Sequence, residues 1–268
     1  MTVPASDVLP SPRQRQRVGN MITVASGKGG VGKTWFSTTL SHALAFDGQR
    51  VLLFDGDLGL ANVDVHLGIT PEWDLASVLA ERVGLEEAVV KFAGGSGSRG
   101  GYDILAGRSG SGALGTLNRA ELQRISRGLV GLAPSYDWLI IDLAAGIDAA
   151  ATTLSAPSGL IYVILTDEPT SLTDAYAFIK VMAQRDAKVP VEVVVNMASD
   201  VAEGKRTYKS IAHACKTFLG FEPPLAGIVR RDEKVKMAIR QQSPILSKYP
   251  KSPAGEDIMA VAEKTRGG

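Results

Sequence analysis

The segment from Gly27 to Thr34, Gly-Lys-Gly-Gly-Val-Gly-Lys-Thr, constrains the fold of this chain more than any other. It satisfies the phosphate-loop pattern G-x-x-x-x-G-K-[ST], which carries meaning only between a buried strand and a helix. The apolar run Met21–Ser26 precedes it, and Lys33–Asp47, a segment of helical period, follows it. Glycines let successive backbone N–H groups form an anion site, and the helix N-terminus adds its positive dipole end. The segment therefore predicts a polyphosphate site at the first strand-to-helix turn.

The rest of the chain alternates short apolar runs with longer segments of helical period. Runs such as Trp138–Asp142 and Leu160–Leu165 are continuously apolar, as strands buried on both faces are. The other expected strands are Arg50–Phe54, Tyr102–Leu105, Val191–Asn196 and Leu225–Val229, and the other expected helices are Leu75–Phe92, Arg119–Leu132, Ser171–Ala187, Gly204–Leu219 and Asp232–Gln241. The pattern predicts an α/β fold with a single doubly wound, mostly parallel sheet flanked by helices. We expect a flexible tail over residues 1–20 and one domain over residues 21–268.

Composition excludes several classes of protein. The chain has 268 residues, of which 45% are hydrophobic and one is cysteine. A single cysteine excludes a disulfide framework and any metal or cluster site that needs several thiolates from one chain, and it indicates a reducing, cytoplasmic setting. We find no signal-peptide pattern at the start and no apolar run near the ~18 residues of a membrane span.

The net charge of +1 conceals an uneven distribution. The segment Lys205–Gly268 holds 13 Lys and Arg against 6 Asp and Glu, a net charge of +7, and the remaining residues carry 16 and 22, a net charge of −6. Such asymmetry marks either a lysine-rich helical surface or a face that meets nucleic acid or an anionic membrane.

Two carboxylate positions complete a site for phosphoryl chemistry, which depends on positioning and charge stabilisation. Lys33 should reach the β- and γ-phosphates, and the Thr34 hydroxyl should bind Mg²⁺. Asp142 ends an apolar strand and fits the Mg²⁺ shell. Asp57 fits the role of orienting the attacking water near the metal. Asp55 either supports Asp57 or caps the segment that follows.

The second lysine of the loop connects these residues to a known family. The stretch Lys28–Thr34 resembles the deviant Walker A motif of the MinD/ParA ATPases. Further stretches are similar to the FlhG (FleN, YlxH) subgroup of that family, which controls flagellar number and placement: Asp55–Val65, Asp142–Ile147, Glu168–Tyr176, Val193–Met197 and Arg231–Pro244. The resemblance covers the chain from about Met21 onward.

This resemblance implies a role for each matching position. Lys28 would contact the phosphates bound by the other subunit, and Asn196 would hydrogen-bond adenine. Phosphate binding within one subunit would involve Gly29, Gly30, Val31, Gly32, Lys33, Thr34 and Trp35, with Thr34, Asp57 and Asp142 at Mg²⁺. ATP would close a face-to-face homodimer, and slow, partner-stimulated hydrolysis to ADP would release monomers. The implied partners are an FlhF-type GTPase and flagellar switch or regulatory proteins.

Two segments depart from the subgroup. Met1–Asn20 shows no clear version of the glutamine-containing helix that stimulates FlhF. The apolar positions of Asp257–Lys264 share one helical face of about two turns, and we expect that face to pack on the domain rather than on a membrane. The basic C-terminal region still favours a peripheral contact with anionic lipid at the inner face of the cell membrane.

The sequence also bears on other functions of related folds. The basic C-terminal region also suits a ParA/MinD-like partitioning or cell-division-positioning ATPase that acts on DNA or membrane, with DNA the less favoured. An iron–sulfur reductase component is excluded, because Cys215 alone cannot supply two thiolates per chain. A cobyrinate-type amidating synthetase would add a glutaminase domain, for which the chain has no room.

Overall fold

A computed structural model describes residues 17–94, 100–107, 117–186 and 190–267. Residues 1–16, most of the tail expected from the sequence, lie outside the described residues. Within the described residues, no helix combines the length and the apolar character that crossing a bilayer requires.

The strands form one eight-stranded sheet in the order β3-β4-β2-β5-β1-β6-β7-β8. All neighbours pair in parallel except β3, which runs antiparallel to β4 at one edge. The strands are β1 Val18–Ala25, β2 Val51–Gly56, β3 Val89–Phe92, β4 Tyr102–Leu105, β5 Trp138–Leu143, β6 Ser158–Leu165, β7 Val191–Ala198 and β8 Leu225–Arg230. The chain order reverses around β1, so the phosphate loop that follows β1 lies where open α/β sheets bind ligands.

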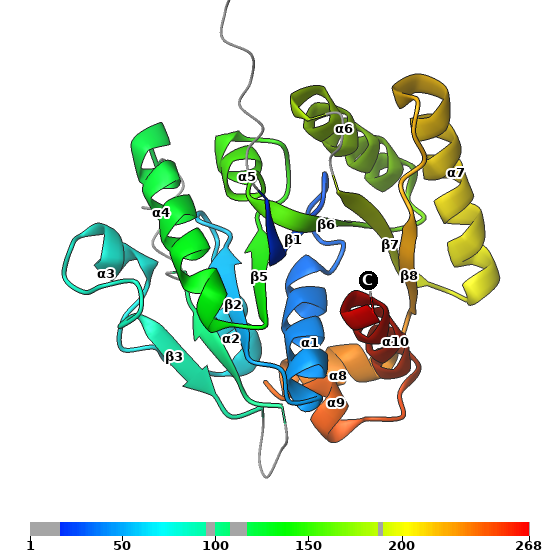
Figure 1. Cartoon of the computed structure of the whole chain (residues 1–268). Coiled ribbons are helices and arrows are strands. Elements are labelled where there is room, and N and C mark those ends of the chain that lie inside the picture. Colours follow the sequence, from blue (N-terminus) through cyan, green and yellow to red (C-terminus); the bar gives the residue numbers. More distant parts are fainter. Residues whose placement is uncertain (1–16, 95–99, 108–116, 187–189, 268) are drawn as a thin grey trace, which may run out of the picture.

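Helices cover both faces of this sheet (Figure 1). Helices α4, α5, α6 and α7 contribute to one hydrophobic core, and helices α1, α2, α8, α9 and α10 contribute to a second core on the opposite face. The helices are α1 Lys33–Phe46, α2 Val63–Leu67, α3 Leu75–Leu79, α4 Arg119–Leu132, α5 Ala149–Leu154, α6 Pro169–Arg185, α7 Val201–Leu219, α8 Glu233–Arg240, α9 Ile245–Lys248 and α10 Pro253–Gly267.

The continuous apolar blocks of the sequence are explained by these two cores. Side chains alternate between the faces of a strand, so a strand covered on both sides needs apolar residues at every position. In β6, Ile161 and Val163 enter one core and Tyr162 and Ile164 enter the other. The expected doubly wound fold is confirmed.

The sequence-based helix Leu75–Phe92 is wrong. Helix α3 ends at Leu79, Glu81 adopts a left-handed conformation with φ of 58°, and the chain then enters strand β3. The β-branched pair at the start of β3 and Phe92 at its end favour a strand, and pairing with β4 satisfies their backbone groups.

The C-terminal helix is longer than expected. Helix α10 has 15 residues rather than about two turns, and it lies beside α1 and β8 (Figure 1). Ile258, Val261 and Ala262 are buried in the second core, so the expected packing of this apolar face on the domain is confirmed. Aliphatic burial of this kind contributes about 1.5–3 kcal/mol per large side chain.

Candidate functional site

The phosphate loop leads from β1 directly into α1. Gly32 precedes the helix with φ of 88°, a left-handed conformation that glycine adopts without penalty. A Cβ at Gly32 would also lie 2.5 Å from Nδ2 of Asn196, so this position has no room for a side chain. Asn196, at the end of β7, donates from Nδ2 to the carbonyl of Val31 at 2.8 Å. Asn196 of β7 therefore helps to hold the phosphate loop in its conformation.

Lys33 is the first residue of α1, and its side chain is buried. Burial lowers the pKa of Lys33, and the negative charges of Asp142 and Asp57 oppose that shift. A buried lysine whose charge is maintained by carboxylates is suited to accept the negative charge of a polyphosphate. The remaining predicted loop residues divide by exposure, since Gly29 and Gly30 are exposed and Val31 and Trp35 are buried in the second core.

Asp142 lies beneath the loop with 1% of its surface exposed. Its Oδ1 accepts a hydrogen bond from Ser37 Oγ at 2.9 Å, and its Oδ2 is buried with no hydrogen-bond partner among the described residues. Burial raises the pKa of Asp142 to about 6, against the nearby Thr34 hydroxyl, the charge of Lys33 and the hydrogen bond from Ser37. A buried carboxylate oxygen without a partner is an ordinary feature of a site that binds a cation.

The donor set fits Mg²⁺. Carboxylate and hydroxyl oxygens are the ligands that Mg²⁺ prefers, and Asp142 and Thr34 supply one of each. The described residues contain no group of three or more His, Cys, Asp or Glu that would hold a metal without help. A metal here would therefore depend on phosphate oxygens and water for the rest of its shell, as Mg²⁺ sites with nucleotides do.

Asp55 and Asp57 differ sharply in their surroundings. The buried Asp55 carboxylate accepts from the backbone N–H groups of Asp57, Asn62 and Val63 at 3.0–3.2 Å. Burial and the charge of Asp142 raise the pKa of Asp55 to about 7, and the three N–H groups oppose that shift. Of the two roles left open by the sequence, these contacts favour the structural one, because Asp55 organises the entry into α2. Asp57 lines the open cavity, and its Oδ1 accepts from the Leu60 N–H at 2.9 Å.

Lys28 is bound by two residues outside the loop. Its Nζ forms an ion pair with Glu168 and donates to Oγ1 of Thr170 at 2.8 Å. Both partners belong to the start of α6, so a short polar bridge joins the loop to that helix in the single chain. The two side chains of the ion pair are 34% and 60% exposed, which makes the bridge weak and easily exchanged for another partner.

One cavity of about 930 Å³ brings most of the predicted residues together. Its wall includes Gly29, Gly30, Gly32, Lys33, Thr34, Trp35, Asp57 and Asn196. Lys28, Val31 and Asp142 are not part of that wall: Lys28 is bound to α6, Val31 is in the core, and Asp142 lies beneath the loop.

Sequence reasoning missed the far walls of the cavity. One is the segment Val229–Asp232 with Val235, Lys236 and Ile239 of α8, and another includes His66, Leu117 and Leu122. A third lies at Ala144–Ala145 and Asp148–Ala151, beside the start of α5. The position of Val229 at the carboxyl end of a strand was the available signal for the first wall.

Comparison with known proteins identifies the class. The model of the CobQ/CobB/MinD/ParA nucleotide-binding domain family matches residues 22–245, so the chain belongs to this family. Together with the phosphate loop, this makes the protein an ATPase of the MinD/ParA type. Among its relatives is the antiactivator FleN of Pseudomonas aeruginosa, 34% identical over 244 residues, which cover 91% of this chain and 85% of FleN. Another is the flagellum site-determining protein YlxH of Helicobacter pylori, 28% identical over 90% of this chain and 80% of YlxH.

Solved structures agree with this assignment. MinD in the MinC:MinD cell division protein complex of Aquifex aeolicus superposes with a TM-score of 0.75 at 26% identity, over 93% of this chain and 96% of that one. MinD of Pyrococcus horikoshii, solved with Mg-ADP, shares the fold with a TM-score of 0.75 at 22% identity, over 91% of this chain and 95% of that one.

Proposed function

We propose that this ATPase is a dimerising switch that regulates flagellar number and placement in the manner of the FlhG subgroup. The observation that carries the biochemical half is the arrangement around the cavity. A phosphate loop lies above a buried carboxylate with one unpartnered oxygen, exposed apolar side chains lie nearby, and Lys28 is held only by a weak, exposed bridge. The observation that carries the cellular half is the similarity to FleN and YlxH along nearly the whole chain.

Different residues of the site bind different parts of the nucleotide. Backbone N–H groups from Gly29 to Thr34 bind the phosphates, and Lys33 neutralises the β- and γ-phosphates. Thr34 and Asp142 would hold Mg²⁺, which would withdraw charge from the phosphate oxygens. Asp57 orients the attacking water from the side of β2. The carboxamide of Asn196 hydrogen-bonds adenine, while its Nδ2 still donates to the carbonyl of Val31.

Dimerisation uses Lys28 and the cavity rim. Leu60 is 74% exposed and Ile147 is 46% exposed, although both are large apolar residues next to the cavity wall. A face-to-face partner would bury them, and Lys28 would exchange Glu168 and Thr170 for the partner's phosphates. Because this exchange needs the terminal phosphate of the partner's nucleotide, the dimer depends on ATP, and hydrolysis releases it.

The experiment for the cellular role is a deletion strain whose flagella are counted by electron microscopy, complemented by the wild-type chain and by Lys33→Ala. We expect an altered number or position of flagella that only the wild-type chain restores. Normal flagellation together with defective chromosome segregation would support the ParA-like alternative instead. The partners we expect are an FlhF-type GTPase and flagellar switch or regulatory proteins, which co-purification under ATP and ADP would identify.

A second function is favoured by one surface. Helix α7 exposes Lys205, Arg206, Lys209 and Lys216, and of these only Lys216 has an ion pair with another described residue, to Glu222 at 3.7 Å. Such a surface suits DNA phosphates or anionic lipid headgroups. DNA binding and vesicle co-sedimentation across a salt series test it, and ATP-dependent DNA binding that weakens with salt would support the partitioning function.

A further inference from the structure

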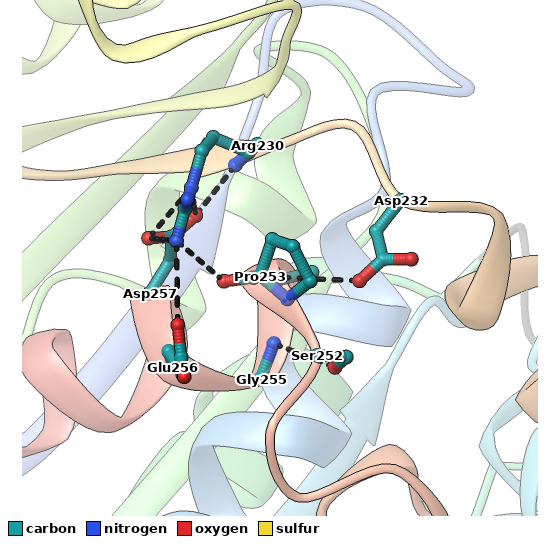
Figure 2. A network of polar contacts seen from close by, with 8 residues as sticks. Arg230, Asp232, Ser252, Pro253, Gly255, Glu256 and Asp257 are labelled. Atoms are coloured by element: carbon teal, nitrogen blue, oxygen red, sulfur yellow. Dashed lines mark hydrogen bonds and ion pairs between the residues drawn. The ribbon is translucent and has the colours of Figure 1, made fainter.

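A polar network joins one wall of the nucleotide cavity to the start of α10 (Figure 2). Arg230, the last residue of β8, makes paired contacts with the Asp257 carboxylate, from Nε at 2.9 Å and from a terminal guanidinium nitrogen at 2.8 Å. The backbone N–H of Arg230 also donates to Asp257 at 2.8 Å. One carboxylate therefore fixes both the side chain and the main chain of a cavity-lining residue.

A second bond repeats this connection two residues later. Asp232 caps α8 by accepting from the Lys234 N–H at 2.9 Å with one oxygen, and its other oxygen accepts from the Ala254 N–H at 3.3 Å. The segment Val229–Asp232 is thus held to the first five residues of α10 at both Arg230 and Asp232. The Asp257 side chain is only 14% exposed, so its paired hydrogen bonds with Arg230 are shielded from water.

The sheet order decides which part of a nucleotide this wall meets. The carboxylates of β2 and β5 lie on one side of β1, the side on which the site proposed above would hold Mg²⁺ and the terminal phosphate. Asn196 at the end of β7 and the segment Val229–Asp232 after β8 lie on the other side. A nucleotide with its phosphates on the loop after β1 therefore extends its nucleoside toward the β7–β8 side.

We propose that Asp257 is a positioning residue for the nucleoside, because it holds the β8–α8 wall in place from the C-terminal helix. This inference rests on the nucleotide site proposed above. Thermodynamic reciprocity adds a consequence: if α10 organises the nucleoside wall, a bound nucleoside must hold the start of α10 more firmly. The C-terminal helix then contributes to binding of the nucleoside but not to binding of inorganic phosphates.

The experiment compares a nucleoside diphosphate with its phosphates alone. Calorimetric titration of the Mg²⁺ forms of ADP and pyrophosphate is carried out on the wild type, on Asp257→Asn and on Glu263→Gln, a charge-matched control on the exposed side of α10. We expect Asp257→Asn to weaken ADP binding by about tenfold and to leave pyrophosphate binding unchanged, with Glu263→Gln like the wild type. Equal weakening of both ligands, or of neither, overturns the inference. Failure of the wild type to bind either ligand would instead contradict the nucleotide site itself.

A measurement on the unaltered protein covers the case in which Asp257→Asn does not fold. Hydrogen exchange is followed for the backbone amides of Ala254–Ile258 with no ligand, with Mg-pyrophosphate and with Mg-ADP. ADP leaves the terminal phosphate position empty, so dimerisation does not contribute. We expect slower exchange with ADP than with pyrophosphate; equal protection by the two ligands overturns the inference.

Discussion

Asp55 and Asp142 are register partners on the neighbouring parallel strands β2 and β5, and both carboxyls are buried. Two buried carboxyls at one level of a sheet cannot both ionise without cost, since each disfavours the charge of the other. The arrangement stores unfavourable electrostatic energy directly beneath the phosphate loop. A bound cation would relieve this repulsion, and the Oδ2 atom of Asp142, which has no hydrogen-bond partner among the described residues, is available to bind it.

The first prediction concerns stability and pH. The pKa values of about 7 for Asp55 and about 6 for Asp142 exceed the ordinary value of 3.8, so folding takes up protons between those limits. The free energy of unfolding contributed by this pair is therefore highest near pH 4 and falls as the pH rises toward 7. Urea unfolding of the nucleotide-free protein across this range should show a shallower fall for Asp142→Asn than for the wild type.

The variant is needed because other groups act in the opposite direction. The pKa values of Asp137 and Glu203 are lowered by hydrogen bonds, with Arg50 and Ser199 respectively, so their contributions grow as the pH rises. They are the same in both proteins, so the difference between wild type and variant reports Asp142 together with its effect on the pKa of Asp55. A difference that stays constant from pH 4 to 7 would contradict the raised pKa.

The second prediction separates three glycines of the loop. Gly29 has open space and no left-handed backbone, Gly30 has open space but φ of 79°, and Gly32 has both φ of 88° and a close neighbour. Gly29→Ala should change the free energy of unfolding by less than about 0.5 kcal/mol. Gly30→Ala should cost about 1–2 kcal/mol, and Gly32→Ala should cost more, because Asn196 must also move. Chemical denaturation without nucleotide measures all three, and equal losses for Gly30→Ala and Gly32→Ala would show that the Asn196 contact is soft.

The third prediction separates the two lysines of the loop. Lys33→Ala should weaken ATP binding by roughly a hundredfold, since a charge-assisted contact to phosphate is lost from a buried position. Lys28→Ala should bind ATP nearly as the wild type does, because the Lys28 side chain is bound to α6 in the single chain. The variant should nevertheless remain monomeric, because it lacks the contact with the partner's phosphates. Calorimetry and light scattering after size exclusion provide the two readouts. An ATP-dependent dimer of Lys28→Ala would refute the contact across the interface.

The fourth prediction concerns Asp57. Asp57→Ala should reduce ATP hydrolysis by roughly a hundredfold or more while leaving ATP binding and dimer formation intact, so that the dimer accumulates. Phosphate release and light scattering check the two halves. Asp55→Ala serves as the contrast: loss of its three backbone contacts should lower the unfolding temperature, which Asp57→Ala should not do. A monomeric Asp57→Ala with ATP bound would count against the water-orienting role.

The fold was predictable because its strongest signals are local. A strand covered on both faces must be apolar at nearly every position, so runs such as Trp138–Asp142 are recognised as strands from sequence alone. The phosphate-loop motif requires a strand before it and a helix after it, which predicts β1 and α1. The segment from Leu75 to Phe92 was misassigned because its apolar residues fit a helical period. Only pairing with β4, which depends on residues ten or more positions later, selects the strand at Val89–Phe92.

The residues of the site were predictable from sequence, but the side-chain contacts that hold them in place were less so. Asp57, Asp142 and Asn196 follow or end strands whose carboxyl ends meet at one edge, and sequence places them there. The pairing of Lys28 with Glu168, and of Arg230 with Asp257, depends on how helices α6 and α10 settle against the sheet. Contacts of that kind join residues far apart in the chain and leave no periodic trace in it.

The placement of β1 and α1 has a consequence for synthesis on the ribosome. Strand β1 is made early but lies between β5 and β6, so its hydrogen bonds wait for residues up to about Leu165. Helix α1 must wait still longer, because Phe36, Leu40 and Leu44 share a core with Ile258 and Val261 of α10. Until α10 is made, the nascent chain thus carries an apolar helix that lacks part of its cover, a state prone to aggregation. We therefore expect the yield of this ATPase to depend on translation rate and chaperone access as well as on its final stability.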